Sequence, residues 1–174
     1  MKKIIFLAML CLMAISICVV VSCTKNENET NEGKYVDLGL SSGTKWKAAN
    51  EKNAADTEYA FFIYNEAVAQ FDSVLPSREQ WEELVNECNW SWTGMGYKIV
   101  GPNGNSISLP AAGFRSCPGS VFTMESLGFY WSSTPNGSHN AWYLNFDSDS
   151  VCMDKCNRCG GFSVRLVQAH ARAH

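Results

Sequence analysis

The clearest periodic pattern in the chain lies between residues 75 and 88, where apolar side chains return at the spacing of a helix. Ser77 is a favourable N-cap, and Gln80 three positions later completes a capping box. The sequence therefore predicts a helix that begins after Ser77 and turns one apolar face inward. The positions on that face, at i, i+3, i+4 and i+7, are Trp81, Leu84, Val85 and Cys88.

The C-terminal third instead alternates between apolar and polar residues, which predicts half-buried antiparallel strands. We expect hairpin turns at 147–150 and near 159–161. Extended pieces are also expected at 35–38, 44–46 and 106–109, with a turn at 101–105 and a helix within 59–71. The bulky positions expected to face inward are Trp131, Trp142, Leu144, Phe146, Val151, Met153, Phe162, Val164 and Leu166.

The N-terminus reads as an export signal rather than as part of the fold. Two lysines precede an apolar run, 4–21, and the tetrapeptide ending at Cys23 resembles the lipobox of bacterial lipoproteins. A membrane-spanning anchor is the alternative, because 18 apolar positions approach the length of a span. We expect a signal peptide at 1–22, lipidation of Cys23, an acidic tether at 23–34, one domain at 35–168 and a tail at 169–174.

Charge narrows the classes of partner. The whole chain carries a net charge of −3, and loss of residues 1–22 removes two lysines and no acid, which leaves −5. A nucleic-acid partner therefore has no electrostatic basis. Acidic residues close to a lipidated cysteine resemble the surface-export signal of Bacteroidetes-type lipoproteins. These features predict an outer membrane lipoprotein that faces the cell surface and contacts the membrane through its N-terminal lipid.

Six segments, taken in order, carry a resemblance to one known family. They are YVDLGLSSGTKW (35–46), LPSREQWEELV (75–85), ISLPAAGFR (107–115), GFYWSST (128–134), AWYLNF (141–146) and GFSVRLV (161–167). With these segments the chain is similar to the major paralogous, or FISUMP-type, domains of Bacteroidetes and Fibrobacter envelope proteins. That resemblance implies a C-type-lectin-like α+β fold, with a twisted antiparallel sheet, one or two helices, and ligand display on the C-terminal loops and strands.

The cysteines leave several alternatives open. Cys152, Cys156 and Cys159 have the spacing of an iron–sulfur motif, although they lie late in an exported chain. A zinc site would need a fourth ligand such as His139. Disulfides are another alternative, and five cysteines after Cys23 leave an odd thiol; these five are Cys88, Cys117, Cys152, Cys156 and Cys159. We expect no metal and no cofactor.

Enzyme chemistry finds little support in the sequence. His139 would have to serve any Ser/His or Cys/His mechanism, because His170 and His174 lie in the tail. The run Thr134-Pro135-Asn136 lacks the carboxylate of a calcium-dependent sugar-binding loop. The hypothesis is therefore a binding module of receptor or adhesin type for an unknown protein or glycan. The alternatives are a structural or pilus-tip envelope subunit, and an enzyme of the formylglycine-generating type.

The polar positions of the C-terminal strands and turns are the candidate ligand-binding residues. Tyr, Asn, Ser, His, Asp, Cys and Gly all have codons that end in a pyrimidine, and adenine edits of an Asn codon reach them. This pattern resembles the variable region of proteins diversified by retroelements, although polar strand exteriors contain the same residues. The candidates are Tyr130, Asn136, Ser138, His139, Asn140, Tyr143, Asn145, Asp147, Asp149, Cys152, Asp154, Cys156, Asn157 and Cys159.

Sequencing the last third of the gene across many cells of one population tests the diversification hypothesis. We expect substitutions to concentrate at the outward positions, while the inward Trp142, Leu144 and Phe146 stay fixed, because a packed core tolerates little change. A uniform segment would contradict diversification and indicate one fixed partner.

Overall fold

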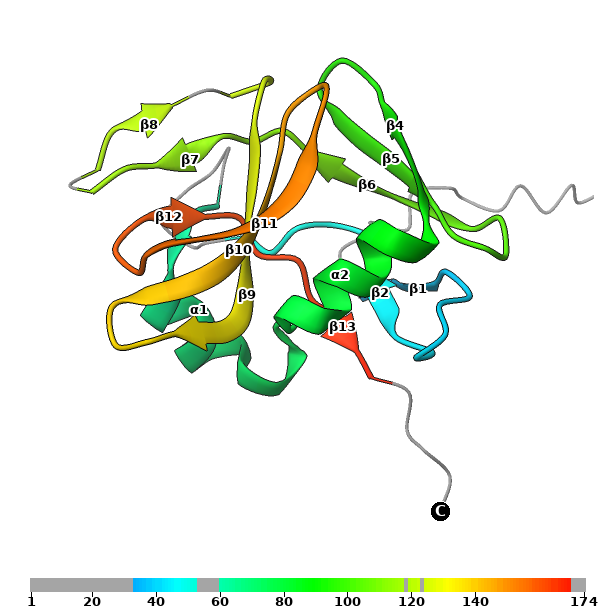
Figure 1. Ribbon diagram of the computed structural model, residues 1–174, viewed down its shortest axis with the longest axis horizontal. Helices are drawn as coiled ribbons and strands as arrows, with labels where there is room; N and C mark the ends of the chain where they lie inside the picture. Colours follow the sequence, from blue (N-terminus) through cyan, green and yellow to red (C-terminus); the bar gives the residue numbers. More distant parts are fainter. Residues whose placement is uncertain (1–32, 53–59, 118, 123, 170–174) are drawn as a thin grey trace, which may run out of the picture.

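The computed structural model describes residues 33–52, 60–117, 119–122 and 124–169 (Figure 1). The predicted signal peptide, Cys23, nearly all of the tether, Tyr59 and His170–His174 lie outside the described residues. Two α-helices and a short 3-10 helix interrupt a series of strands. In chain order the elements are β1 (Tyr35–Asp37), β2 (Lys45–Lys47), β3 (Phe62–Ile63), α1 (Tyr64–Phe71), η2 (Asp72–Val74), α2 (Arg78–Glu87), β4 (Asn89–Trp92), β5 (Gly96–Val100), β6 (Ser106–Pro110), β7 (Phe114–Arg115), β8 (Val121–Phe122), β9 (Gly128–Asn136), β10 (Asn140–Phe146), β11 (Val151–Asn157), β12 (Gly161–Phe162) and β13 (Val167–Gln168).

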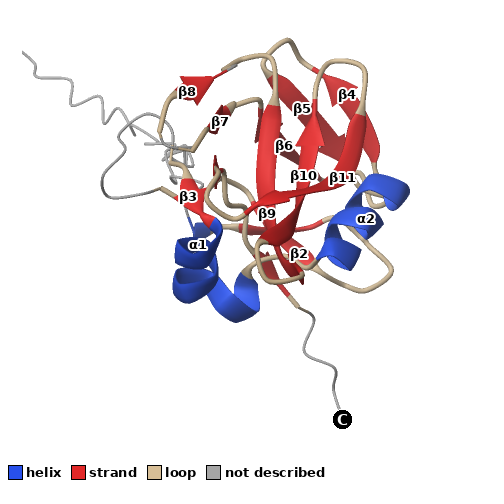
Figure 2. Ribbon diagram, turned by 60° about the vertical axis from the view of Figure 1, so that its left-hand side comes forward, coloured by secondary structure: helices blue, strands red, loops and turns tan. Residues whose placement is uncertain are grey.

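The strands form four small sheets, and the three longest strands share one of them. That sheet has the order β11-β10-β9 and is antiparallel throughout. The others have the orders β1-β2-β13, β3-β12-β7-β8 and β4-β5-β6. Figure 2 shows the four sheets gathered around β9 and β10, with α1 and α2 at the periphery. The β9–β11 sheet is therefore the centre around which the other elements pack.

The expected fold class was wrong. Of the described residues, 43% are in strands and 17% in helices, so the structure is mainly β, and it divides its strands among four sheets instead of building one twisted sheet beside helices. An α+β C-type-lectin-like fold is not what these elements form. One reason for the division into small sheets is that closely spaced turns between residues 89 and 122 allow only strands of two to five residues. Within the described ranges, neither helix is long and apolar enough to cross a membrane.

The helix predicted after Ser77 is confirmed as α2. The backbone N–H of Gln80 donates to Ser77 Oγ at 3.3 Å, and the backbone N–H of Ser77 donates to Gln80 Oε1 at 2.9 Å. This reciprocal pair satisfies two donors that would otherwise lack partners at the helix start. Trp81 and Leu84 are completely buried. The first helix is also confirmed within the predicted range, although α1 has only eight residues.

Two hydrophobic clusters enclose the central sheet, one on each face. Tyr130 and Trp131 are neighbours in β9, yet both are fully buried, because their side chains enter opposite clusters. The first cluster contains Trp46, Trp81, Ile99, Leu109, Tyr130, Leu144 and Phe146. The second contains Phe62, Ala67, Trp131, Ala141, Tyr143 and Phe162. Alternation therefore fails to separate inside from outside along the middle of β9 and β10.

The predicted alternating strand at 162–166 is also wrong. Every residue from Gly161 to Val167 is buried, and only the short strands β12 and β13 flank this stretch. Arg165 is 1% exposed, and its guanidinium donates to Asn50 Oδ1 at 2.9 Å, to the Lys47 carbonyl at 2.8 Å and to the Ser108 carbonyl at 2.7 Å. These bonds join the segment between β12 and β13 to the end of β2, to the loop after β2 and to β6.

We predict that Arg165→Ala lowers the free energy of unfolding by about 3 kcal/mol or more, because the buried acceptors lose a charged donor. Urea denaturation checks this value. Lys98→Ala, at an exposed position of β5, serves as the matched control and is expected to change stability by less than about 0.5 kcal/mol. Equal midpoints for the two variants would contradict the role given to Arg165.

Candidate binding surfaces

The fourteen candidate residues do not form one surface. The structure distributes them over the β9–β10 turn, the β10–β11 turn, the β11–β12 turn, the face of β10 and β11, and the protein interior. Seven are exposed: Ser138, His139, Asp149, Cys152, Asp154, Asn157 and Cys159. Five are partly buried: Asn136, Asn140, Asn145, Asp147 and Cys156. The remaining two, Tyr130 and Tyr143, are buried.

Tyr130 and Tyr143 therefore have to be removed from the predicted outward set. The Tyr130 hydroxyl donates to the Pro110 carbonyl at 2.7 Å and accepts from Asn50 Nδ2 at 3.1 Å, and burial raises its pKa to about 12. Tyr143 is 8% exposed, and burial, with a smaller effect from the Asp154 carboxylate, raises its pKa to about 12. Both tyrosines are packing residues, although an edge of Tyr143 reaches the surface.

Trp142 was expected to face inward and instead lies partly open. Trp142 pairs with Lys155 of β11 in unbroken register with Leu144 and Phe146, but it belongs to neither hydrophobic cluster. The register shift between β9 and β10 places its extra residues in β9. Arg78, at the start of α2, places its guanidinium carbon 3.9 Å from the centre of the Trp142 ring. This cation–π contact attaches the helix to the sheet. The inward prediction for Leu144 and Phe146 is confirmed.

One part of the predicted surface does come together on the face of β10 and β11. Asn145 lies opposite Phe129 of β9 and Cys152 of β11, so these three side chains form one cross-strand row. Tyr143 and Asp154 are paired in the next row. Cys152 Sγ donates to Asn145 Oδ1 at 3.3 Å. We call Asn145, Cys152 and Asp154, with the adjacent Phe129 and Tyr143 rings, the β10–β11 face.

A ladder of aromatic rings extends this face toward the β7–β8 hairpin. Ring centres lie 5.7 Å apart for Phe122 and Phe114, 4.8 Å for Phe114 and Phe129, and 5.7 Å for Phe129 and Tyr143. Phe122 at the outer end is 46% exposed, whereas Tyr143 at the inner end is buried. The ladder places aromatic surface directly beside polar groups. The alternation pattern does not predict it, because its members come from four strands and meet only through the packing of those strands.

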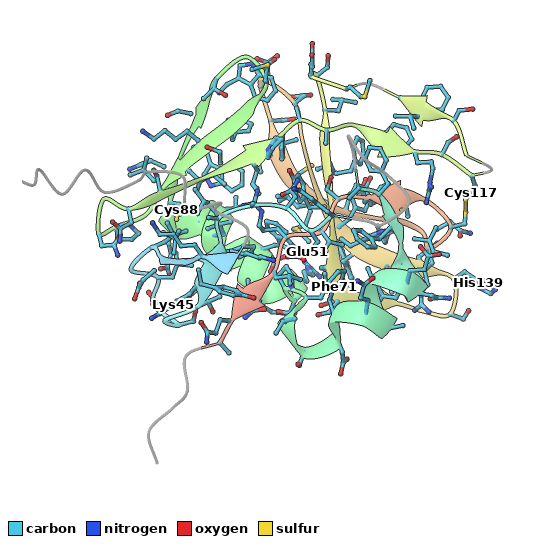
Figure 3. The ribbon with its side chains drawn as sticks, turned by 180° about the vertical axis from the view of Figure 1, so that it is seen from behind. Lys45, Glu51, Phe71, Cys88, Cys117 and His139 are labelled. Carbon is cyan, nitrogen blue, oxygen red and sulfur yellow. A yellow bond between two sulfur atoms is a disulfide. The ribbon has the colours of Figure 1, made fainter. Side chains whose placement is uncertain are left out.

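The candidates in the β9–β10 and β11–β12 turns form a separate group. Arg158 joins the turns: its backbone N–H donates to the His139 carbonyl at 3.0 Å, and its guanidinium donates to the carbonyls of Asn140 and Gly137. His139 is exposed, with its Nδ1 2.7 Å from Ser138 Oγ (Figure 3). This is a contact between sequence neighbours at a hairpin tip, and no carboxylate of the described residues binds this histidine.

Asp147 stabilises a turn. Its Oδ1 accepts from the backbone N–H groups of Asp149 and Ser150, both at 2.8 Å, and from Ser150 Oγ at 3.1 Å. These donors lower the pKa of the Asp147 carboxyl. The hairpin predicted at 147–150 is confirmed, since the Asp147 N–H also donates to the Ser150 carbonyl. Asp149 remains exposed beside it.

The five cysteines of the described residues separate into a bonded pair and three free thiols. Cys117, in the connection between β7 and β8, is disulfide-bonded to Cys159, with 5.8 Å between the Cα atoms. Cys159 is therefore joined to a residue outside the Cys152-x3-Cys156-x2-Cys159 motif. In the described parts of the chain, no group of three or more His, Cys, Asp or Glu side chains is arranged to hold a metal ion.

The free thiols differ in environment. Burial raises the pKa of Cys156 to about 12 and that of Cys88 to about 11, with smaller contributions from nearby carboxylates. Both thiols are therefore almost entirely protonated at neutral pH. Cys152 is exposed on β11, which is an edge strand of its sheet.

Sequence reasoning missed a second surface at the end of the molecule formed by the β4–β5 turn and the segment after β8. Met95 there is 66% exposed and Met124 is 44% exposed. Beside Met95 lies a cavity of about 340 Å³. Exposed methionines carry no periodic signal, so the sequence could not distinguish them from core residues. The cavity is lined by Thr93, Met95, Gly96, Tyr97, Ser108, Leu109, Pro110, Ala111, Ala112 and Glu125.

Comparison with known proteins gives one finding. A family model described as a domain of unknown function, DUF8237, matches residues 85–167, just under half of the chain. The match includes β4 to β12 and therefore contains both the β10–β11 face and the cavity. No curated protein and no solved structure matches the chain.

We predict an order of thiol reactivity toward iodoacetamide at pH 8. Cys152 should be alkylated first because it is exposed, while Cys88 and Cys156 should react at least about tenfold more slowly because their raised pKa values leave little thiolate. Cys117 and Cys159 should react only after reduction. Peptide mass spectrometry over time checks this order, and fast alkylation of Cys156 would contradict its placement against the second cluster.

Proposed function

We propose that this protein is a lipid-anchored module that binds a protein or glycan ligand at the cell surface through its β10–β11 face. The observation that carries the proposal is the direct contact on this face between polar groups and aromatic rings. Asn145, Cys152 and Asp154 are open to solvent in whole or in part beside Phe129 and Tyr143. Such a surface offers hydrogen bonds and apolar contact together.

The chemistry of this face suits recognition. Asn145 supplies an amide that both donates and accepts, and Asp154 supplies a carboxylate that accepts. The rings of Phe129 and Phe114 add apolar area at low cost in side-chain entropy, since aromatic side chains have few rotatable bonds. Because the cores on both sides fix the register of β10, these groups are already in position before a ligand arrives.

The anchoring part of the proposal rests on the N-terminal sequence. The basic residues, the apolar run and Cys23 resemble a lipoprotein signal, and a polar acidic segment of about ten residues follows. A segment of that composition cannot bury apolar area and would act as a tether between the lipid anchor and the module. The module would then stand away from the outer membrane, where it could meet ligands outside the cell.

Diversification of the face remains part of the proposal, with a changed set of positions. Variation should fall on exposed or partly exposed side chains such as Asn145, Cys152 and Asp154. Tyr130 and Tyr143 move to the fixed group, because changing a packed aromatic residue costs several kcal/mol, roughly 3–5 for removal of a large ring. Trp142 also belongs with the restricted positions through its contact with Arg78.

Binding to glycan and envelope-protein arrays tests the proposed function. The chain without the predicted signal peptide, with Cys23 replaced, is the probe. The double variant Asn145→Ala, Asp154→Ala should bind any ligand found in this way with at least about tenfold lower affinity, because two hydrogen-bonding groups at the centre of the contact are removed.

Asn89→Ala is the matched control, since Asn89 is an exposed asparagine on β4, in another sheet. It should leave the affinity unchanged. A ligand that binds both variants equally would show that the face is not the binding surface. Concentration-dependent polymerisation with no array ligand would contradict the proposal and favour a structural envelope subunit.

A further inference from the structure

The apolar end of the molecule contains the large hydrophobic side chains that the described residues expose most. They are Met95 at 66%, Val121 at 48%, Phe122 at 46% and Met124 at 44% exposed. Removing such side chains from water is favourable by about 25 cal/mol per Å² of apolar surface buried. A partner that covers these four side chains would therefore gain free energy from their burial. Contiguous exposed apolar residues commonly mark an interaction site.

Backbone hydrogen bonds bring the β4–β5 turn and the segment after β8 together. The Ala111 N–H donates to the Met95 carbonyl at 2.9 Å, and the Glu125 N–H donates to the Ala111 carbonyl at 2.7 Å. Ala111 therefore lies between the β4–β5 turn and the segment that contains Met124. That segment continues back to Phe122, which is paired with Phe114. Figures 1 and 2 agree that the β4–β5 turn and the start of β9 lie at the same end of the molecule.

The cavity of about 340 Å³ lies within this surface, bounded by Met95, Leu109 and Ala112. Gly96 contributes to its wall with a φ of 143°, and a Cβ there would lie 2.2 Å from the Leu109 carbonyl oxygen. The cavity therefore depends on a residue that no other amino acid could replace without a backbone shift. Its size suits one large apolar side chain rather than an extended ligand.

The charge around the cavity is negative. Glu125 is the one acidic residue in its lining, and it adopts a φ of 66°, the one positive φ of a non-glycine residue in the described chain. The carboxylates of Asp147 and Asp149 lie near enough to Tyr97, another lining residue, to contribute to its raised pKa, after the larger effect of burial. Arg115 places its side chain against Gly161, away from the cavity lining.

We infer that the apolar end binds a polypeptide segment in which a large apolar side chain is flanked by lysine or arginine. The apolar side chain enters the cavity, and the two exposed methionines adapt to it, as flexible thioether side chains do at binding surfaces. The flanking cations face Glu125 and the β10–β11 turn. A bilayer is the less suitable occupant, because bacterial lipid surfaces are commonly anionic and the acidic groups would be repelled. Met95, Met124 and Glu125, the residues on which this site depends, are not part of the β10–β11 face.

Titration with three acetylated and amidated peptides tests the inference. They are Gly-Ser-Lys-Trp-Lys-Ser-Gly, its glutamate counterpart Gly-Ser-Glu-Trp-Glu-Ser-Gly, and Gly-Ser-Lys-Ser-Lys-Ser-Gly, which lacks the aromatic anchor. Fluorescence anisotropy of the labelled peptides is measured at low salt with the chain that lacks the predicted signal peptide. It should give a Kd below about 1 mM for the first peptide only. That affinity should fall as salt rises, because the flanking charges are exposed.

Variants at exposed positions link the binding to this surface without disturbing the core. The double variant Met95→Ser, Met124→Ser should weaken binding of the first peptide at least about tenfold, and Glu125→Gln should weaken it roughly two- to fivefold. Glu79→Gln, an exposed acid on α2, is the matched charge control and should have no effect. Unchanged near-ultraviolet circular dichroism confirms that each variant is folded.

Three outcomes would overturn the inference. Equal binding of the lysine and glutamate peptides would remove the role of charge. Binding that survives the methionine double variant would place the site elsewhere. Tight binding to phosphatidylcholine vesicles, lost in the same double variant while none of the peptides binds, would make the surface a membrane contact instead. Failure of the peptide test would leave the array test of the β10–β11 face unaffected, because the two use different residues.

Discussion

The structure depends on the burial of β9 and β10 between two hydrophobic clusters. Adjacent residues such as Tyr130 and Trp131 point to opposite faces of the sheet, and each enters a core. Burial of two large aromatic side chains from consecutive positions fixes both the register and the position of the strand, because a shift of one residue would exchange them. Trp81 from α2 and Phe162 from β12 complete the two clusters, and so the separate small sheets pack around one centre.

This arrangement also decides where functional groups can stand. The second cluster covers Trp131 and Tyr143 but ends before Asn145 and Cys152, so polar side chains emerge beside the last rings of the core. Their positions are fixed by packing on both sides of the strand, which suits a surface that binds without rearrangement. The apolar end arises from the opposite situation, since the β4–β5 turn and the segment after β8 leave Met95 and Met124 exposed.

Local signals predicted several elements correctly. The capping box at Ser77 and Gln80 and the helical spacing of Trp81 and Leu84 established α2, because these interactions operate within one helix. The turns at 101–105 and 147–150 were likewise confirmed. The three polar residues of the β10–β11 face were also predictable, since Asn145, Cys152 and Asp154 lie where alternation places them. The burial of Tyr143 and the partial exposure of Trp142 were not, because they depend on which distant elements cover each face of β10.

The sequence by itself determined the start of α2, the hairpin turn between β10 and β11, and the polar character of the strand exteriors. All three depend on neighbours within a few positions of the chain. Only the tertiary structure decided that the central sheet is covered on both faces, that Arg165 is buried with three acceptors, and that Cys117 bonds to Cys159. The fold class followed the same rule and was mispredicted. The physical reason is that a strand's pattern records which residues are apolar, whereas burial depends on which distant elements cover each face.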